Sequence, residues 1–142
     1  NMWTTIASMN NRRQSHLAFL LQDGTVLAVG GHNGSSALNT AEIYNSSANT
    51  WTLVGSMTDR RRYFTAGMLQ DGTILVVGGD NGSAMLGSVE LYDPSTRSWT
   101  AVNSTISKRQ SNIQSLLLDG RVLIAGSYQS PNALASAEIY QP

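Results

Sequence analysis

The chain has 142 residues, a formal net charge of zero, no cysteine, and a hydrophobic fraction of 41%. This length and composition fit one globular domain, and no run of 18 apolar residues predicts a membrane span. The lack of cysteine excludes disulfides and thiolate metal sites, and the neutral charge argues against nucleic-acid and membrane partners.

A repeat of 48 residues runs through the chain without an insertion. Trp3, Trp51 and Trp99 mark its starts, and 23 of 48 positions are identical between the first two copies. We therefore expect a single domain, 1–142, built from repeats 3–50, 51–98 and 99–142.

The first repeat predicts four short strands and no helix. They are expected at residues 15–21, 26–29, 41–44 and 51–54. Asp23-Gly24 between the first two apolar runs is a strong hairpin signal. Gly30-Gly31 ends the second strand, where glycine permits a positive φ and close backbone approach. Four antiparallel strands per repeat are typical of one blade of a β-propeller.

The same residues carry a family resemblance. A double glycine after the second strand, Glu-x-Tyr on the third and Trp on the fourth resemble the kelch repeat, over the whole chain. The resemblance implies an all-β propeller with four-stranded antiparallel blades, three per chain. Ser127, Thr105 and Gln114 depart from the pattern of the other repeats, where glycine, methionine and alanine stand. We expect the third blade to form, with a different corner between its second and third strands.

The order of the strands bears on assembly. Residues 3–7 carry the fourth-strand pattern, whereas the last repeat reaches only its third strand, at 138–140. Propellers have roughly four to eight blades, so three blades predict a six-bladed ring. Two copies of the chain would form it if each strand 3–7 completes the third blade of its partner. A longer polypeptide with three more blades would form it too, and repeat symmetry does not separate these alternatives.

Seven of the nine Lys and Arg residues lie between a fourth strand and the next first strand. They are Arg12, Arg13, Arg60, Arg61, Arg62, Lys108 and Arg109. Because strands alternate in direction, these loops share a face with the loops between second and third strands. This basic-leaning face predicts binding of an acidic peptide or an anionic glycan.

Residues that recur in every repeat are expected to be structural. Arg13, Arg61 and Arg109 would pair with Glu42, Glu90 and Glu138, since buried charges need partners. The three tryptophans would pack between blades. Residues that break the repeat, or flank the arginine column, are the ligand-binding candidates. They are Arg12, Arg60, Arg62, Lys108, His16, Tyr63, Asn112, His32, Asp80 and Tyr128.

The function predicted is a non-enzymatic scaffold that recognises a protein or peptide. The alternatives are a carbohydrate-binding propeller, and a fragment or engineered folding unit with no ligand of its own. Two histidines without cysteine leave no metal-ligand spacing, no Gly-x-Ser-x-Gly elbow occurs, and no cofactor is expected. The kelch-type copper oxidases need a tyrosine–cysteine pair that this chain lacks. Four Asn-x-Ser/Thr sequons, at Asn33, Asn45, Asn81 and Asn103, weakly favour an extracellular location.

Overall fold

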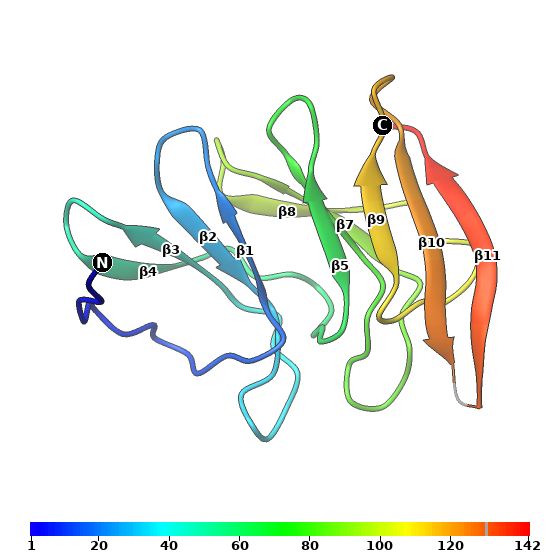
Figure 1. Ribbon diagram of the computed structural model, residues 1–142, viewed down its shortest axis with the longest axis horizontal. Helices are drawn as coiled ribbons and strands as arrows, with labels where there is room; N and C mark the ends of the chain where they lie inside the picture. The colour runs from blue at the N-terminus through cyan, green and yellow to red at the C-terminus, as the bar shows by residue number, and fades with distance from the viewer. Residues whose placement is uncertain (130) are drawn as a thin grey trace.

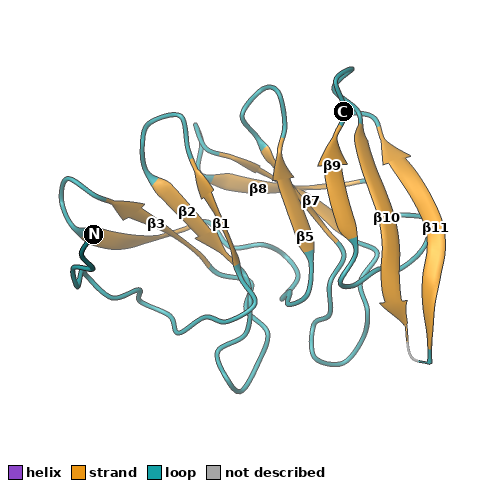
Figure 2. Cartoon of the chain, viewed as in Figure 1, coloured by secondary structure: helices purple, strands orange, loops and turns teal. Residues whose placement is uncertain are grey.

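The computed structural model describes residues 1–129 and 131–142, and these residues form strands, turns and loops (Figure 2). The strands are β1 Leu17–Leu20, β2 Val26–Val29, β3 Ala41–Asn45, β4 Thr50–Val54, β5 Thr65–Met68, β6 Ile74–Val77, β7 Val89–Asp93, β8 Ser98–Val102, β9 Ile113–Leu116, β10 Val122–Gln129 and β11 Asn132–Tyr140. In this described part of the chain, no helix is long and apolar enough to cross a membrane.

The strands form three antiparallel sheets arranged as a fan (Figure 1). Two sheets have four strands, in the orders β1-β2-β3-β4 and β5-β6-β7-β8, and the third has the order β11-β10-β9. The two termini lie at opposite ends of the fan (Figure 1). The all-β architecture with one antiparallel sheet per repeat is therefore confirmed, and we call the sheets blade 1, blade 2 and blade 3 in chain order.

The first two strands of each blade are joined by the predicted Asp-Gly turn. Asp23 Oδ1 accepts hydrogen bonds from the backbone N–H and the hydroxyl of Thr25, and Gly24 has a φ of 81°. Asp71 and Thr73 repeat these bonds in blade 2. Such local bonds fix a tight turn, which brings the apolar runs on either side into antiparallel register.

The core lies between the blades. Alternate residues of β6 point to opposite faces of blade 2, as the period of a strand requires. Ile74 and Val76 pack in the cluster shared with blade 1, and Leu75 and Val77 pack in the cluster shared with blade 3. Because both faces are covered, all four residues of β6 are buried. Each fully buried side chain of this size contributes roughly 1.5–3 kcal/mol.

Blade 3 differs at the corner that the sequence had marked. In blade 2 the double glycine turns out of β6, with φ values of 65° at Gly78 and 96° at Gly79. In blade 3 Ser127 occupies the second position, and a positive φ is unfavourable for a residue with a Cβ. The chain stays extended there, so β10 and β11 continue into a long hairpin with a register shift between Ala125 and Ser127. The predicted difference at this corner is confirmed.

Residues 3–7 form no strand within this chain, and the Trp3 side chain is fully exposed. Among the described residues, β11 has a strand partner only on its β10 side. The strand predicted at 3–7 therefore requires pairing that a single chain does not supply, and closure of a ring by two chains stays a prediction.

Candidate functional site

The loops that enter each blade meet the loops between its second and third strands on one face of the molecule. We call this face the loop rim, made of residues 8–16, 30–40, 55–64, 78–88 and 103–112. Backbone bonds join it across blades, from Arg61 N–H to Leu38 O at 2.9 Å and from Gly31 N–H to Arg61 O at 2.8 Å. Arg109, Leu86 and Gly79 repeat both bonds one blade later. The prediction that the two kinds of loop share a face is confirmed.

A buried arginine anchors each entering loop. The Arg61 side chain is 0% exposed, and its Nη2 lies 2.8 Å from Glu90 Oε1 on β7. Its Nη1 donates to the carbonyls of Gly78 and Ser88, at 2.8 and 2.9 Å. The guanidinium thus joins the end of β6, the start of β7 and the entering loop, which explains why arginine recurs at this position.

The other two repeats make the same ion pair. Arg13 Nη2 lies 2.9 Å from Glu42 Oε1, and Arg109 Nη2 lies 2.8 Å from Glu138 Oε1. Burial alone raises the pKa of Glu42, but hydrogen bonds from Asn10 and Arg13 outweigh it and hold the pKa below its usual value. Glu138 shows the same balance, with Arg109 and the backbone of Ile106 as donors that lower its pKa. These carboxylates stay charged and belong to the scaffold.

Two of the three tryptophans stack on a tyrosine of their own blade. The Trp51 ring lies 5.1 Å from the Tyr44 ring, and its Nε1 donates to Ala7 O. In blade 2 the Trp99 ring lies 5.0 Å from the Tyr92 ring, and Nε1 donates to Gly55 O at 2.7 Å. Trp99 thus packs against the cluster between blades 1 and 2, whereas Trp51 contacts the N-terminal segment, so its packing between blades stays a prediction.

Three cations on the loop rim are exposed, one in each entering loop: Arg12, Arg60 and Lys108. Within residues 1–129 and 131–142, none of the three makes an ion pair. Each precedes a buried arginine, so the loop that carries it is fixed by the contacts described above.

A second repeated pair of positions, which we call the rung, lies at the start of blades 1 and 2, where the backbone of residue 14 bridges to residue 32 and that of residue 62 to residue 80. In blade 2 the rung is an ion pair, with Arg62 Nε 2.9 Å from Asp80 Oδ1. In blade 1 it is a neutral pair, Gln14 and His32, whose Nε2 and Nδ1 atoms lie 3.4 Å apart. Arg62, one of the ligand-binding candidates, therefore has its charge neutralised by Asp80 within this chain.

Comparison with protein families identifies the repeat. The model described as the kelch motif matches residues 15–58 and 61–105, well over half of the chain. The chain belongs to the kelch-repeat family. Propellers of this family are in general non-catalytic scaffolds for protein interaction. No curated protein matches the chain.

The remaining candidates of this kelch chain lie at different depths. His16 is half-buried, and burial, followed by the charge of Arg13, lowers its pKa. The amide atoms of Asn112 are covered, with no hydrogen-bond partner among the described residues. Tyr63 and Tyr128 are 47% and 58% exposed. Tyr128 lies within β10 and not in a loop, because this strand extends past the corner.

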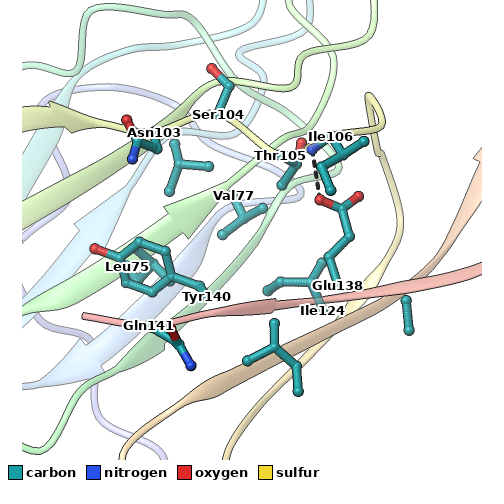
Figure 3. A pocket seen from close by; sticks show the side chains of 13 residues that line it. Leu75, Val77, Asn103, Ser104, Thr105, Ile106, Ile124, Glu138, Tyr140 and Gln141 are labelled. Atoms are coloured by element: carbon teal, nitrogen blue, oxygen red, sulfur yellow. Dashed lines mark hydrogen bonds between the residues drawn. The ribbon is translucent and has the colours of Figure 1, made fainter.

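A cavity beside β11 is the feature that sequence reasoning missed (Figure 3). Its volume is about 340 Å³, and Leu75 and Val77 of blade 2 and Tyr140 of blade 3 line it. The matching space between blades 1 and 2 is filled by Met57 and Trp99. Here Thr105 replaces methionine, and within the described residues no tryptophan stacks on Tyr140. The substitution at Thr105 was the signal that could have located the cavity.

Proposed function

We propose that the loop rim recognises an acidic segment of a partner protein. The observation that carries this proposal is the repeated exposed cation, Arg12, Arg60 or Lys108, on a loop that a buried ion pair fixes. Fixed loops lose little conformational entropy on binding, which favours affinity. Arginine also binds carboxylates through two parallel hydrogen bonds.

The charges of the two faces support this choice of partner. Seven of the nine cations lie in the loop rim. Five of the nine carboxylates lie in the rim or are the strand glutamates that pair with its buried arginines. The opposite face, with the Asp-Gly turns, has two cations and four carboxylates. Of these cations, Arg121 is paired with Asp119 at 2.7 Å. An acidic segment is therefore attracted to the loop rim and repelled by the opposite face.

The test is a binding titration with a fluorescent peptide of alternating glutamate and glycine. The triple substitution Arg12→Gln, Arg60→Gln and Lys108→Gln should weaken binding about tenfold or more, because each lost partner is a charge-assisted hydrogen bond. The matched control, Arg97→Gln with Arg121→Gln on the opposite face, should stay within about twofold, as surface changes away from a site usually do.

Salt provides a second readout for the same peptide. Raising the ionic strength from 0.1 M to 1 M shortens the Debye length from about 10 Å to about 3 Å, so binding should weaken strongly. Binding that survives 1 M salt, or that is unchanged in the triple variant, contradicts the proposal, as does a lack of measurable binding at 0.1 M.

Carbohydrate binding is the second candidate, and the exposed rings of Tyr63 and Tyr128 favour it. Aromatic faces beside polar side chains can stack on sugar rings while hydrogen bonds fix the hydroxyls. A neutral oligosaccharide that binds with no loss in the triple variant, and loses affinity on Tyr63→Ser, would replace the acidic partner with a sugar.

We also propose that two chains close a six-bladed ring. The support comes from the outer edge of β11, which has no strand partner among the described residues, and from Trp3, which is exposed where its equivalents stack on tyrosine. By the same spacing, the partner's strand at residues 3–7 would lie along β11 and place its tryptophan on Tyr140, over the cavity. The rival source of that strand is a longer polypeptide.

A further inference from the structure

Every blade begins at a residue with left-handed backbone. The φ values are 53° at Ser15, 55° at Tyr63 and 49° at Ser111, the same position in the three repeats. These three residues lie in the loop rim, and two of them are bonded to each other, since Ser111 N–H donates to Tyr63 O at 2.7 Å. Blades 1 and 3 place a small serine there, but blade 2 has tyrosine, and a bulky residue with positive φ is a genuine outlier.

Packing does not explain this tyrosine. The residue is 47% exposed, unlike Tyr92, which is fully buried. The guanidinium of Arg62 lies over the Tyr63 ring, with its carbon 5.3 Å from the ring centroid. An exposed ring on an unfavourable backbone costs stability, and such outliers cluster at binding sites.

The contacts of Arg62 with Asp80 and Tyr63 leave the end of its guanidinium without a partner among the described residues. Its Nε donates to Asp80 Oδ1 at 2.9 Å, and the same oxygen accepts the Gly82 N–H at 2.9 Å. Tyr63 supports the guanidinium from its flat face. Among the described residues, Nη1 and Nη2 have no hydrogen-bond partner, and the side chain is 27% exposed. The free end of the guanidinium is thus a fixed pair of donors, the geometry that a carboxylate accepts.

We propose that Arg62 and Tyr63 form a receptor for one carboxylate, an Asp or Glu side chain followed by an apolar residue in the partner segment. The inference rests on the proposed function and locates its anchor in blade 2. The Arg62 donors bind the carboxylate, and the exposed ring of Tyr63 contacts the apolar neighbour. Blades 1 and 3 lack the set, because Gln14 and Gln110 stand in place of the arginine.

The local charge favours a carboxylate over a phosphate. Asp80 already lies 2.9 Å from the guanidinium, so the pair is neutral before a ligand arrives. A phosphate group carries a charge of about −1.5 to −2 at pH 7 and would meet stronger repulsion from Asp80 than a carboxylate does.

The test uses short peptides and NMR detection of the Arg62 Nε–H signal in the 142-residue chain. Acetyl-Glu-Leu-amide should shift this signal in a saturable way, and acetyl-Gln-Leu-amide should bind about tenfold or more weakly, because the charge-assisted bonds are lost. Equal affinity for the two peptides overturns the proposal. Tighter binding of acetyl-phosphoserine-Leu-amide overturns the choice of carboxylate.

The variants are taken from the other blades, so the fold has a precedent for each. Tyr63→Ser, and Arg62→Gln combined with Asp80→His, recreate the residues of blade 1. Each variant should bind acetyl-Glu-Leu-amide about tenfold or more weakly. Backbone amide signals measure this affinity, because the Arg62→Gln variant has no Nε–H signal. Tyr63→Ser should not lower the melting temperature, since it relieves the backbone. Unchanged affinity in both variants overturns the receptor.

The two proposals fail separately. The triple variant at Arg12, Arg60 and Lys108 should keep the dipeptide affinity within about twofold while it loses the longer acidic peptide. If the dipeptide does not bind but the longer acidic peptide still binds in a charge-dependent way, only the receptor proposal is refuted. If binding of the longer peptide depends neither on Arg12, Arg60 and Lys108 nor on salt, the proposed function is refuted.

Discussion

Neighbouring arginines on one loop have opposite environments in this protein. Arg61 is enclosed and donates to two carbonyls and a carboxylate, whereas the side chain of Arg60 extends into solvent. The difference follows from the backbone bonds that fix residue 61 against the preceding blade. A single residue step thus separates a structural charge from one that is available to a partner.

Alanine substitutions at these two positions should separate the roles. Arg61→Ala leaves the Glu90 carboxylate buried without its cation and should lower the free energy of unfolding by about 3–5 kcal/mol. Arg60→Ala should change it by about 0.5 kcal/mol or less. Urea denaturation of both variants measures the difference, and equal unfolding midpoints would refute the assignment.

Residue contacts could be predicted from the sequence where they repeat. The Arg61–Glu90 pair recurs in all three copies, so the spacing alone indicated it. The Arg62–Asp80 pair occurs once and was not predicted. A weaker signal was present, because residues 14 and 32 change together with residues 62 and 80 between repeats, from Gln and His to Arg and Asp.

At the scale of strands, the two blades at the ends of the fan expose apolar side chains. Leu20 on β1 is 68% exposed and Ile113 on β9 is 63% exposed, whereas the corresponding faces of blade 2 are covered. Exposed apolar faces and an unpaired strand edge are typical of surfaces that another chain covers.

If residues 3–7 complete the third blade of a partner chain, removing the Trp3 side chain should abolish the dimer. The chain should scatter light as a dimer near twice its mass of 15.2 kDa, and Trp3→Ala should shift it to a monomer, because Tyr140 would lose its stacking partner. Leu53→Ala, at an exposed position of β4, is the control and should leave the dimer intact. A folded monomer at micromolar concentration, or a dimer that persists in Trp3→Ala, would contradict the two-chain ring.

Strand positions were predicted closely because local chemistry sets them. Residues 26–29 match β2 without a shift, since an Asp-Gly turn precedes the strand and a double glycine ends it. The length of β10 and β11 was not predicted. Ser127 indicated a change at the corner, but whether the chain forms a loop or a hairpin depends on pairing between distant residues.

At the scale of the whole molecule, folding lowers the pKa of six carboxyl groups. Hydrogen bonds from Thr25 lower the pKa of Asp23, and the Asp71, Asp93 and Asp119 turns show the same direction. The pKa values of the buried Glu42 and the partly buried Glu138 are lowered too. The charged groups of all three blades therefore respond to acid together.

Acid should destabilise the protein in two steps. Since folding lowers these carboxyl pKa values, the unfolded chain binds more protons, and stability is lost as pH falls below the ordinary Glu pKa of 4.5. The lowered pKa of His16 adds a shallow loss that begins already near 6.5. His16→Asn, which copies Asn112, should remove only the shallow step. The midpoint of thermal unfolding, followed from about pH 8 to about pH 3, measures both, and a midpoint that rises with acid would disprove the linkage.

The bonds between blades have a consequence for how genes of this kind change length. Trp51 bonds to Ala7 and Trp99 to Gly55, while Arg61 bonds to Leu38 and Arg109 to Leu86. Each bond spans the same number of residues as its counterpart, so a recombination event that inserts or deletes one unit of 48 residues restores every bond, wherever in the repeat it begins. A length change that is not a multiple of 48 residues alters the spacing of every bond whose two partners lie on either side of the junction. Unequal recombination should thus yield viable proteins only in whole blades.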